Sequence, residues 1–183
     1  VRECELKKED LILPVFVSDH CNSKEKIESM PEVYRWSIDE LLLQIESWHK
    51  NGINAFALFP CVENQKKCPL GKEALNLDSV CYRAAKKIKE NFPDILLIGD
   101  LALDPFTTHG HDGILDALGK VDNDLTVDVL CKSSVIAAES GFDIVAPSDM
   151  MDGRVGQIRI SLDNAGFEKV AILAYSAKFC SSY

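Results

Sequence analysis

Five apolar runs of strand length alternate with four helical patterns, and this alternation is the strongest constraint on the fold. The apolar runs are residues 11–17, 53–59, 95–103, 144–147 and 170–178. The helical patterns run from Ser37 to Gly52, from Asp78 to Pro93, from Asn123 or Asp124 to Gly141, and from Arg154 to Gly166. Runs that are apolar throughout are typical of strands covered on both faces, so we predict an α/β fold whose parallel sheet has right-handed crossovers.

Cap residues set the predicted helix starts. Ser37 and Glu40 have the spacing of a capping box. Asn123 or Asp124 is the predicted cap of the third helix. Asp152 is either the cap of the fourth helix or part of a site beside it.

Two architectures fit five strands that alternate with four helices. A flavodoxin-like open sheet would normally finish with a helix over its last strand, whereas the sequence reaches Tyr183 five residues after Lys178. We therefore expect the last strand to be left uncovered. Residues 11–183 are predicted to be part of a larger parallel (β/α)8 TIM barrel, with about its first five strands present.

Charge and hydropathy exclude several classes of partner. The net charge of -9 and the pI near 4.9 argue against a nucleic-acid-binding surface. The apolar stretches are too short to span a bilayer and residues 1–4 do not resemble a signal peptide, so the expected location is the cytoplasm. The seven cysteines are odd in number and irregular in spacing, which argues against a disulfide framework.

Lys178 ends the last apolar run, at the edge of the sheet where α/β enzymes keep their chemistry. Burial and a second nearby cation would lower the pKa of such a lysine, and its neutral amine would then attack a carbonyl to form a Schiff base. The alternative is a lysine that leaves the strand and reaches water. Its position in the sequence does not choose between these interpretations.

Residues 99–113 bring carboxylates, hydroxyls and two histidines together after a buried strand. Two interpretations of this segment are open. Its side chains are potential ligands for a divalent metal, namely Asp104, His109, His111 and Asp112. The alternative is a solvated loop with a turn at Gly110, because motif matches without structural context are often false positives.

The segment after the fourth apolar run places further polar groups at the same edge of the sheet. Residues 148–154 contain a hydroxyl, two carboxylates and an arginine. Asp100 and Ser148 leave adjacent predicted strands at positions comparable to that of Lys178 on its own strand. Because the carboxyl ends of parallel strands meet at one edge, these three side chains are predicted to converge on one pocket.

Six segments of the chain have a specific and familiar pattern. They are Ser29-Met30-Pro31, Leu58-Phe59-Pro60, Ala102 to Thr107, His109 to Gly113, Val145 to Arg154, and Ala174 to Lys178. With these segments the chain resembles the porphobilinogen synthase (5-aminolevulinate dehydratase) family, of which it would be the N-terminal portion. The resemblance implies a (β/α)8 barrel lyase that condenses two molecules of 5-aminolevulinate into porphobilinogen, with loss of two waters, in haem and tetrapyrrole biosynthesis.

The resemblance also implies roles for individual residues. In that family two lysines form Schiff bases with the two substrates, and one of them maps onto Lys178. The other lysine and the arginines that bind substrate carboxylates belong to family segments beyond the end of this sequence. Asp100 and Ser148 match polar residues of the family's active site, with hydrogen-bonding and proton-handling roles, while Tyr175 and Asp149 are the expected substrate-binding residues.

The expected metal dependence follows from three positions. Zinc-dependent members carry cysteines where this chain has Ala102, Asp104 and Asp112. The chain therefore resembles the branch without this zinc–cysteine site, whose members commonly use Mg²⁺. The Mg²⁺ site is expected outside this chain, and no organic cofactor is expected. A metal at Asp104 and Asp112 is an alternative, for which hard oxygen ligands would favour magnesium over zinc.

The resemblance further implies an assembly and a compartment. The family forms homo-octamers through an N-terminal arm, of which residues 1–10 are the expected remnant. Besides 5-aminolevulinate and copies of itself, no nucleic-acid or membrane partner is expected, and a plastid is the alternative to the cytoplasm. Glu32 stands where the family usually has glycine, so the turn at this residue is expected to differ.

Two other interpretations stay open at this point. One is another Schiff-base lyase on the same kind of barrel, such as a class I aldolase, although the long motif in residues 99–113 argues against it. The other is a noncatalytic fragment, because a barrel that lacks several strands exposes sheet edges and apolar surface.

Overall fold

The computed structural model describes residues 3–178, which form one sheet flanked by α-helices. The strands are β1 (Ile12–Ser18), β2 (Lys24–Lys26), β3 (Tyr34–Ser37), β4 (Ala55–Cys61), β5 (Leu96–Leu101), β6 (Ile144–Pro147) and β7 (Ala171–Ile172). The α-helices are α1 (Ile38–Lys50), α2 (Val80–Asn91), α3 (Asn123–Glu139) and α4 (Arg154–Asn164). Short 3₁₀ turns lie at Lys8–Asp10, Asn64–Lys66 and Lys72–Leu75. None of the helices within residues 3–178 has the length and apolar character needed to cross a membrane.

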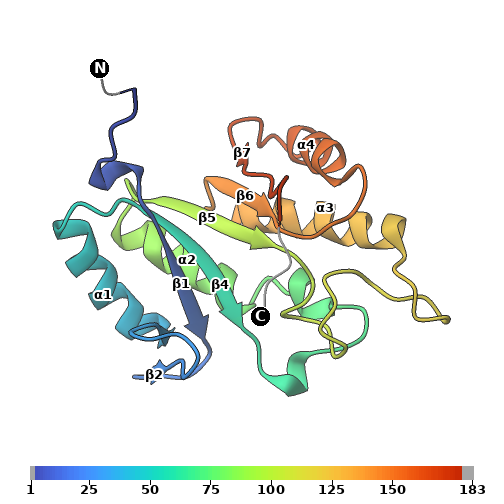
Figure 1. The fold of residues 1–183 in the computed structure, drawn as a ribbon, viewed down its shortest axis with the longest axis horizontal. Coiled ribbons are helices and arrows are strands. Elements are labelled where there is room, and N and C mark those ends of the chain that lie inside the picture. The colour runs from blue at the N-terminus through green and yellow to red at the C-terminus, as the bar shows by residue number, and fades with distance from the viewer. Residues whose placement is uncertain (1–2, 179–183) are drawn as a thin grey trace.

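The sheet order is β2-β3-β1-β4-β5-β6-β7, so the five predicted strands are neighbours in chain order (Figure 1). All four pairings among these five strands are parallel. A flavodoxin-like sheet would reverse its strand order at a switch point, and these five strands show no reversal. Because right-handed crossovers in one direction put each helix on the same face, the arrangement matches successive units of a barrel. Residues 3–178 do not close that barrel, since β2 and β7 are the two ends of the sheet.

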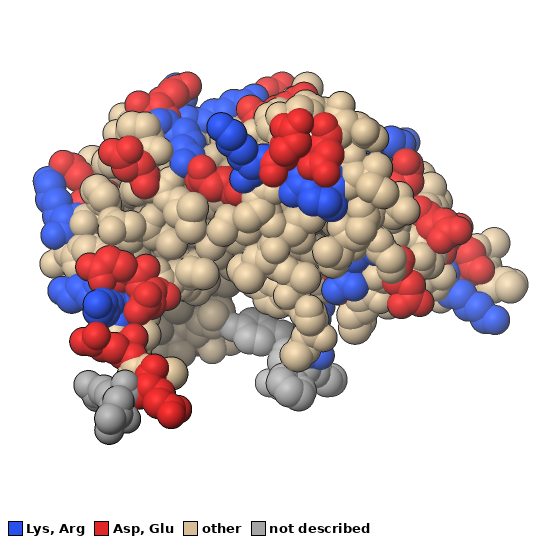
Figure 2. Space-filling view, turned by 90° about the horizontal axis from the view of Figure 1, so that it is seen from above, with Lys and Arg blue, Asp and Glu red and all other residues tan. Residues whose placement is uncertain are grey.

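Alternate residues of each strand face opposite sides of the sheet. On the helix side, Phe56 and Leu58 of β4 belong to the main core, together with buried side chains from all four α-helices. On the other face, Ala57, Ile98 and Ala146 form a small second cluster. This second face is the one that would point into a barrel, and we call it the inner face. In Figure 2 the charged side chains gather along the upper and side margins of the view, while the middle of the surface is mostly uncharged.

Two strands were not predicted from the sequence. β3 pairs with β1 in parallel, and β2 pairs with β3 in antiparallel orientation. β2 is Lys24-Glu25-Lys26 and contains no apolar residue, so hydrophobic periodicity does not mark it. Tertiary contacts hold it instead, because the Lys24 ammonium lies 4.2 Å from the ring centroid of Tyr34 and 4.7 Å from that of Trp36.

The predicted capping box at the start of α1 is wrong. Ser37 is the residue before the helix, but its side chain makes no cap hydrogen bond. Its Oγ instead accepts the N–H of Ser23 at 2.9 Å and donates to the carbonyl of Ser23 at 3.1 Å. The hydroxyl therefore holds the loop before β2 rather than the helix terminus.

The other two predicted caps are shifted by one residue or more. Asp122, rather than Asn123 or Asp124, caps α3, and its Oδ1 accepts a main-chain N–H at 3.0 Å. Gly153, rather than Asp152, precedes α4, and it has a φ of +76°. A left-handed residue at this position is favourable for glycine and costly for other residues, which explains the shift.

The last apolar run is a strand only over its first residues. β7 covers Ala171–Ile172, although main-chain hydrogen bonds continue from Leu173 to Val145 and from Tyr175 to Pro147. The run pairs with β6 on one side only, and Leu173 is 41% exposed. Within residues 3–178 this run is therefore a partly exposed edge strand and not the predicted central strand.

The turn at residues 30–33 keeps the backbone that glycine favours, although Glu32 occupies it. Glu32 has a φ of +62°, in the left-handed region. The main-chain N–H of Val33 donates to the carbonyl of Met30 at 3.1 Å, which closes the turn. Glutamate therefore bears the steric cost of a conformation that glycine adopts freely, and the expected difference of this turn from that of the family stays a prediction.

Replacing Glu32 by glycine is expected to stabilise the protein by about 0.5–1 kcal/mol. Relief of left-handed strain is worth roughly 1–2 kcal/mol, and the greater freedom of glycine in the unfolded chain offsets part of it. The measurement is the free energy of unfolding in urea. Glu32→Ala is the matched control, because it removes the same side chain but keeps Cβ. A Glu32→Gly protein that is no more stable than Glu32→Ala would contradict the prediction.

Candidate active site

Asp100 and Ser148 meet on the inner face at the carboxyl ends of β5 and β6. Asp100 lies two residues after Ile98, and Ser148 lies two residues after Ala146, so strand alternation puts them on the inner face. Ser148 Oγ donates a hydrogen bond of 2.5 Å to Asp100 Oδ1. The predicted convergence of these two side chains is confirmed.

The surroundings of Asp100 change its acidity. Burial raises the pKa of this carboxyl to about 7, and the hydrogen bond from Ser148 opposes the shift. The negative charges of Asp104 and Asp149 raise the same pKa, whereas the positive charge of Lys178 lowers it. A carboxyl with a pKa close to neutrality can both accept and release a proton, which is what general acid–base chemistry requires.

Lys178 faces this site from the chain segment that follows β7. Its Nζ lies 3.3 Å from Asp112 Oδ2, and its side chain is 40% exposed. Asp112 itself is only 7% exposed, so one partner of this ion pair is fixed by packing. Lys178 is therefore brought to the same site as Asp100, as predicted, but its direct partner is Asp112. The sequence placed Asp112 only among candidate metal ligands.

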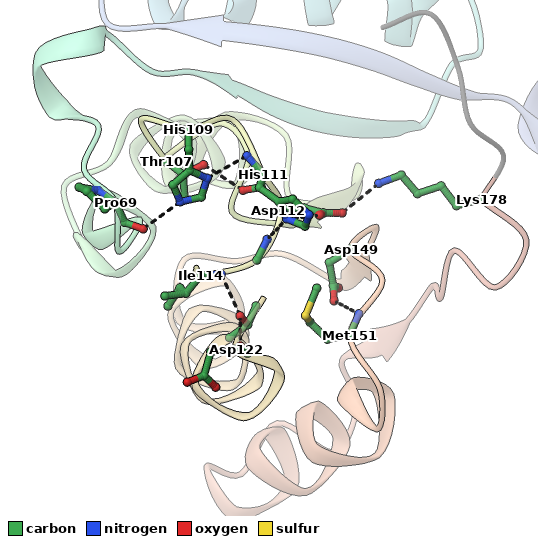
Figure 3. Close-up of polar contacts among 12 residues, drawn as sticks. Pro69, Thr107, His109, His111, Asp112, Ile114, Asp122, Asp149, Met151 and Lys178 are labelled. Carbon is green, nitrogen blue, oxygen red and sulfur yellow. Dashed lines mark hydrogen bonds and ion pairs between the residues drawn. The ribbon is translucent and has the colours of Figure 1, made fainter. Parts of the chain in front are cut away.

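A network of loop contacts surrounds Asp112 (Figure 3). His109 Nδ1 accepts the main-chain N–H of His111 at 3.1 Å, and Thr107 Oγ1 donates to the carbonyl of His111 at 2.9 Å. His111 Nδ1 accepts the N–H of Gly113 at 2.9 Å and also lies 3.0 Å from Asp112 Oδ1. The long connection after β5 is thus an ordered structure around Asp112.

Asp149 is fully buried beside the site. Its Oδ2 accepts the main-chain N–H of Met151 at 2.8 Å, and its Oδ1 lies 3.0 Å from Arg154 Nε. Burial raises the pKa of Asp149, while the Met151 N–H and the Arg154 charge oppose the shift. In residues 3–178 this carboxylate holds the turn before α4, and its role in substrate binding stays a prediction.

Tyr175 lies on the segment between β7 and Lys178 and is 39% exposed. Burial of its hydroxyl and the negative charge of Asp100 both raise the pKa of this phenol. Tyr175 therefore keeps its proton at neutral pH and can donate a hydrogen bond to a ligand. Its predicted role as a substrate-binding residue is untested.

The candidate metal ligands do not form a metal centre among residues 3–178. No group of three or more His, Cys, Asp and Glu side chains in this part of the chain is arranged to hold a metal ion. His109 uses both ring nitrogens for protein contacts, because Nε2 lies 3.1 Å from the carbonyl of Pro69 and Nδ1 accepts the His111 N–H. Asp104 is exposed on the surface, although partial desolvation of its carboxyl raises its pKa. A metal shared by Asp104 and Asp112 stays a prediction.

The whole chain matches a known family model. Residues 1–183 match the model described as delta-aminolevulinic acid dehydratase. The chain is 46% identical to the delta-aminolevulinic acid dehydratase of Bradyrhizobium diazoefficiens, over 100% of this chain and 52% of that protein. It is 39% identical to the chloroplastic delta-aminolevulinic acid dehydratase of Chlamydomonas reinhardtii, over 100% of this chain and 47% of that protein. The chain thus spans about half the length of the curated relatives it matches.

A solved structure has the same fold. The crystal structure of the delta-aminolevulinic acid dehydratase (porphobilinogen synthase) from Toxoplasma gondii ME49, in complex with the reaction product porphobilinogen, superposes with a TM-score of 0.96. Sequence identity is 46%, and the match covers 100% of this chain and 52% of that one. This match supports a barrel rather than a flavodoxin-like sheet.

Proposed function

Because the chain belongs to the delta-aminolevulinic acid dehydratase family, we propose that its protein is the lyase that condenses two molecules of 5-aminolevulinate into porphobilinogen. The reaction releases two waters and supplies haem and other tetrapyrroles. The observation that carries this proposal is the position of Lys178, whose ammonium faces Asp112 beside the Asp100–Ser148 pair. With this family established, a class I aldolase no longer has support.

Lys178 is the nucleophile in this proposal. The Asp112 carboxylate, 3.3 Å from Nζ, takes one proton from the ammonium. The neutral amine then attacks the ketone carbon of 5-aminolevulinate and forms a carbinolamine. Return of the proton from Asp112 to the carbinolamine hydroxyl releases water and leaves a protonated imine on Lys178. Asp112 is then a carboxylate again.

Asp100 and Ser148 handle protons in the later steps. The pKa of Asp100 near 7 lets its carboxyl exchange a proton with a substrate carbon or nitrogen at neutral pH. Ser148 donates to Asp100 Oδ1 and thereby orients the other oxygen toward the ligand. Tyr175 contacts the substrate through its phenol, whereas a contact of the substrate with Asp149 would require its buried carboxylate to be uncovered.

The test is borohydride reduction in the presence of 5-aminolevulinate, followed by peptide mass spectrometry. It uses the complete gene product that contains these residues as well as the isolated chain. A reduced adduct on Lys178 is expected in the complete product. An adduct in the complete product alone would mean that the site needs segments beyond these residues. A folded complete product with no adduct on Lys178 would contradict the proposal and favour a noncatalytic role.

The enzyme belongs to the magnesium-type branch in this proposal. A zinc–thiolate site does not fit residues 102–112, since Ala102 has no donor atom and the carboxylates of Asp104 and Asp112 are hard ligands. In addition, Asp112 Oδ2 already faces the Lys178 ammonium. The Mg²⁺ therefore occupies a site outside these residues, and no step above depends on it.

Removal of metal gives a prediction that separates the two branches. Treatment with 1,10-phenanthroline is expected to leave porphobilinogen formation within about two-fold of the untreated rate, because a soft chelator removes zinc but not magnesium. Treatment with EDTA is expected to lower the rate, and Mg²⁺ rather than Zn²⁺ is expected to restore it. Loss of activity with phenanthroline, reversed by Zn²⁺, would place the enzyme in the zinc branch.

The assembly and compartment follow the same reasoning. The protein is a homo-octamer that uses an N-terminal arm, of which residues 1–10 are a part. The structure describes residues 3–10 as exposed. The compartment is the cytoplasm or a plastid, and relatives from Chlamydomonas reinhardtii and Pisum sativum support the second. Light scattering of the complete protein tests the octamer, and cell fractionation tests the compartment.

A further inference from the structure

Two loops at the carboxyl end of the sheet are joined to each other close to the active site. They are the connection between β4 and α2 and the connection between β5 and α3. The N–H of Cys68 in the first loop donates to the carbonyl of Phe106 in the second at 3.2 Å. His109 supplies another link, since its Nε2 lies 3.1 Å from the carbonyl of Pro69.

The hydrogen bonds of the His109 ring define its tautomer. Nδ1 accepts the main-chain N–H of His111 at 3.1 Å, so this nitrogen carries no proton. Nε2 must then carry the proton and donate it to the carbonyl of Pro69. One neutral imidazole thus bridges its own loop and the neighbouring one, and neither nitrogen is left over for another ligand.

The segment that His109 holds is followed directly by Asp112, the residue that contacts Lys178. His111 is fixed through its N–H by His109 and through its carbonyl by Thr107, at 3.1 Å and 2.9 Å respectively. Asp112 is the next residue, and its Oδ2 lies 3.3 Å from Lys178 Nζ (Figure 3). On the far side, Gly113 is packed so closely that an added Cβ would lie 2.7 Å from Val121. Asp112 therefore sits between two anchored points of the loop.

We propose that His109 is a positioning residue for Schiff-base formation, which it serves by tying the loop of Asp112 to Pro69 so that the carboxylate stays against Lys178. This inference rests on the proposed function. Small displacements of a reacting group cost large factors in rate, so a link outside the site can still govern the reaction.

Two substitutions test the two hydrogen bonds of the His109 ring separately. In His109→Gln the amide nitrogen can still donate to the Pro69 carbonyl, because it occupies about the place of Nε2. In His109→Asn the side-chain oxygen can still accept the N–H two residues on, but the shorter side chain does not reach Pro69. The proposal assigns the effect to the link between the loops, so His109→Asn should behave like His109→Ala, and His109→Gln should stay close to the wild type.

The first readout is the kinetics of porphobilinogen formation by the complete gene product. His109→Ala and His109→Asn are expected to lower kcat about ten- to a hundred-fold and to change KM by less than about three-fold, since positioning of the nucleophile rather than substrate binding is affected. His49→Asn is the matched control. His49 is an exposed histidine of α1 whose Nδ1 lies 2.7 Å from Asn54 Oδ1, at the amino end of β4 and away from both loops, and its replacement should leave kcat unchanged.

The second readout needs no substrate. Acetylation of Lys178 by acetic anhydride at fixed pH, followed by peptide mass spectrometry, reports whether a carboxylate still faces the amine. Loss of the Asp112 carboxylate, which lies 3.3 Å from Nζ, uncovers the amine and changes this rate. The rate in His109→Asn is therefore expected to match that in Asp112→Asn, and His109→Gln should keep the wild-type rate. This comparison decides the inference even if His109→Ala fails to fold.

Three different results would overturn the inference. If His109→Asn and His109→Gln share one acetylation rate and one kcat, His109 does not act through Pro69. If the wild-type protein itself forms no reduced adduct with 5-aminolevulinate on Lys178, the proposed function fails and this inference fails with it. A wild-type adduct combined with rates that are independent of residue 109 would overturn the positioning role alone.

Discussion

Replacement of Lys178 by methionine is expected to lower porphobilinogen formation on the order of 10⁴-fold or more. Removal of a covalent nucleophile leaves only binding and electrostatic effects, and losses of this size are typical. Methionine keeps the length of the side chain but offers no amine. The measurement is the rate of product formation by the complete gene product, together with borohydride trapping and peptide mass spectrometry. Neither turnover nor an adduct at residue 178 is expected.

Two control variants test whether the loss of activity is specific to the amine of Lys178. Lys178→Arg keeps a positive charge beside Asp112, but a guanidinium stays protonated and does not form the imine, so it should be as inactive as Lys178→Met. Lys169→Met changes an exposed lysine just before β7 and should leave the rate unchanged. Product formation by Lys178→Met at more than about a hundredth of the wild-type rate would place the nucleophile elsewhere.

The sequence predicted the strands and helices that packing determines. β1, β4, β5 and β6 are largely apolar runs that contribute buried side chains to the core, so composition alone predicts them. β2 was not predicted because its three residues are charged. Contacts with the aromatic side chains of β3 hold it in place. The predicted capping box of α1 was wrong because Ser37 uses its hydroxyl on Ser23, a residue whose proximity depends on the tertiary fold.

The site was predictable where it depends on strand order and not where it depends on loop conformation. Asp100 and Ser148 follow adjacent parallel strands, so their convergence needs only the register of β5 and β6. The contact of Lys178 with Asp112 depends on the path of about twenty loop residues after β5. No local pattern encodes that path, and the bridge from His109 to Pro69 joins residues forty positions apart.

Replacement of Asp100 by asparagine is expected to lower kcat about 10²–10⁴-fold while leaving the Lys178 adduct in place. The amide keeps the size of the side chain and an oxygen that accepts from Ser148, but it no longer takes up or releases a proton. Imine formation relies on the neighbouring Asp112, so borohydride trapping should still label Lys178. Loss of the adduct along with turnover would show that Asp100 acts in the first step, contrary to this assignment.

The difference in stability between Asp100→Asn and the wild type is expected to depend on pH, and the protonation of Asp100 in the native and unfolded states gives its sign. Burial raises the pKa of Asp100 from the ordinary 3.8 to about 7, so between these values the native protein holds a proton that the unfolded chain has released. The free energy of unfolding of the wild type must then fall as pH rises from about 4 to about 7. Asparagine does not titrate, so Asp100→Asn should gain stability relative to the wild type across this range, by at most about 4 kcal/mol.

Urea unfolding at about pH 4.5, 6 and 7.5, which covers the range of this linkage, measures that difference. Asp128→Asn is the matched control, because Asp128 is an exposed carboxylate on α3 that pairs with Lys132. A stability difference between Asp100→Asn and the wild type that stays constant over this range would mean that Asp100 is ionised throughout. In that case Asp100 would serve as a fixed negative charge opposite Lys178 rather than as an acid and base, because a group that holds no proton near neutrality has none to deliver.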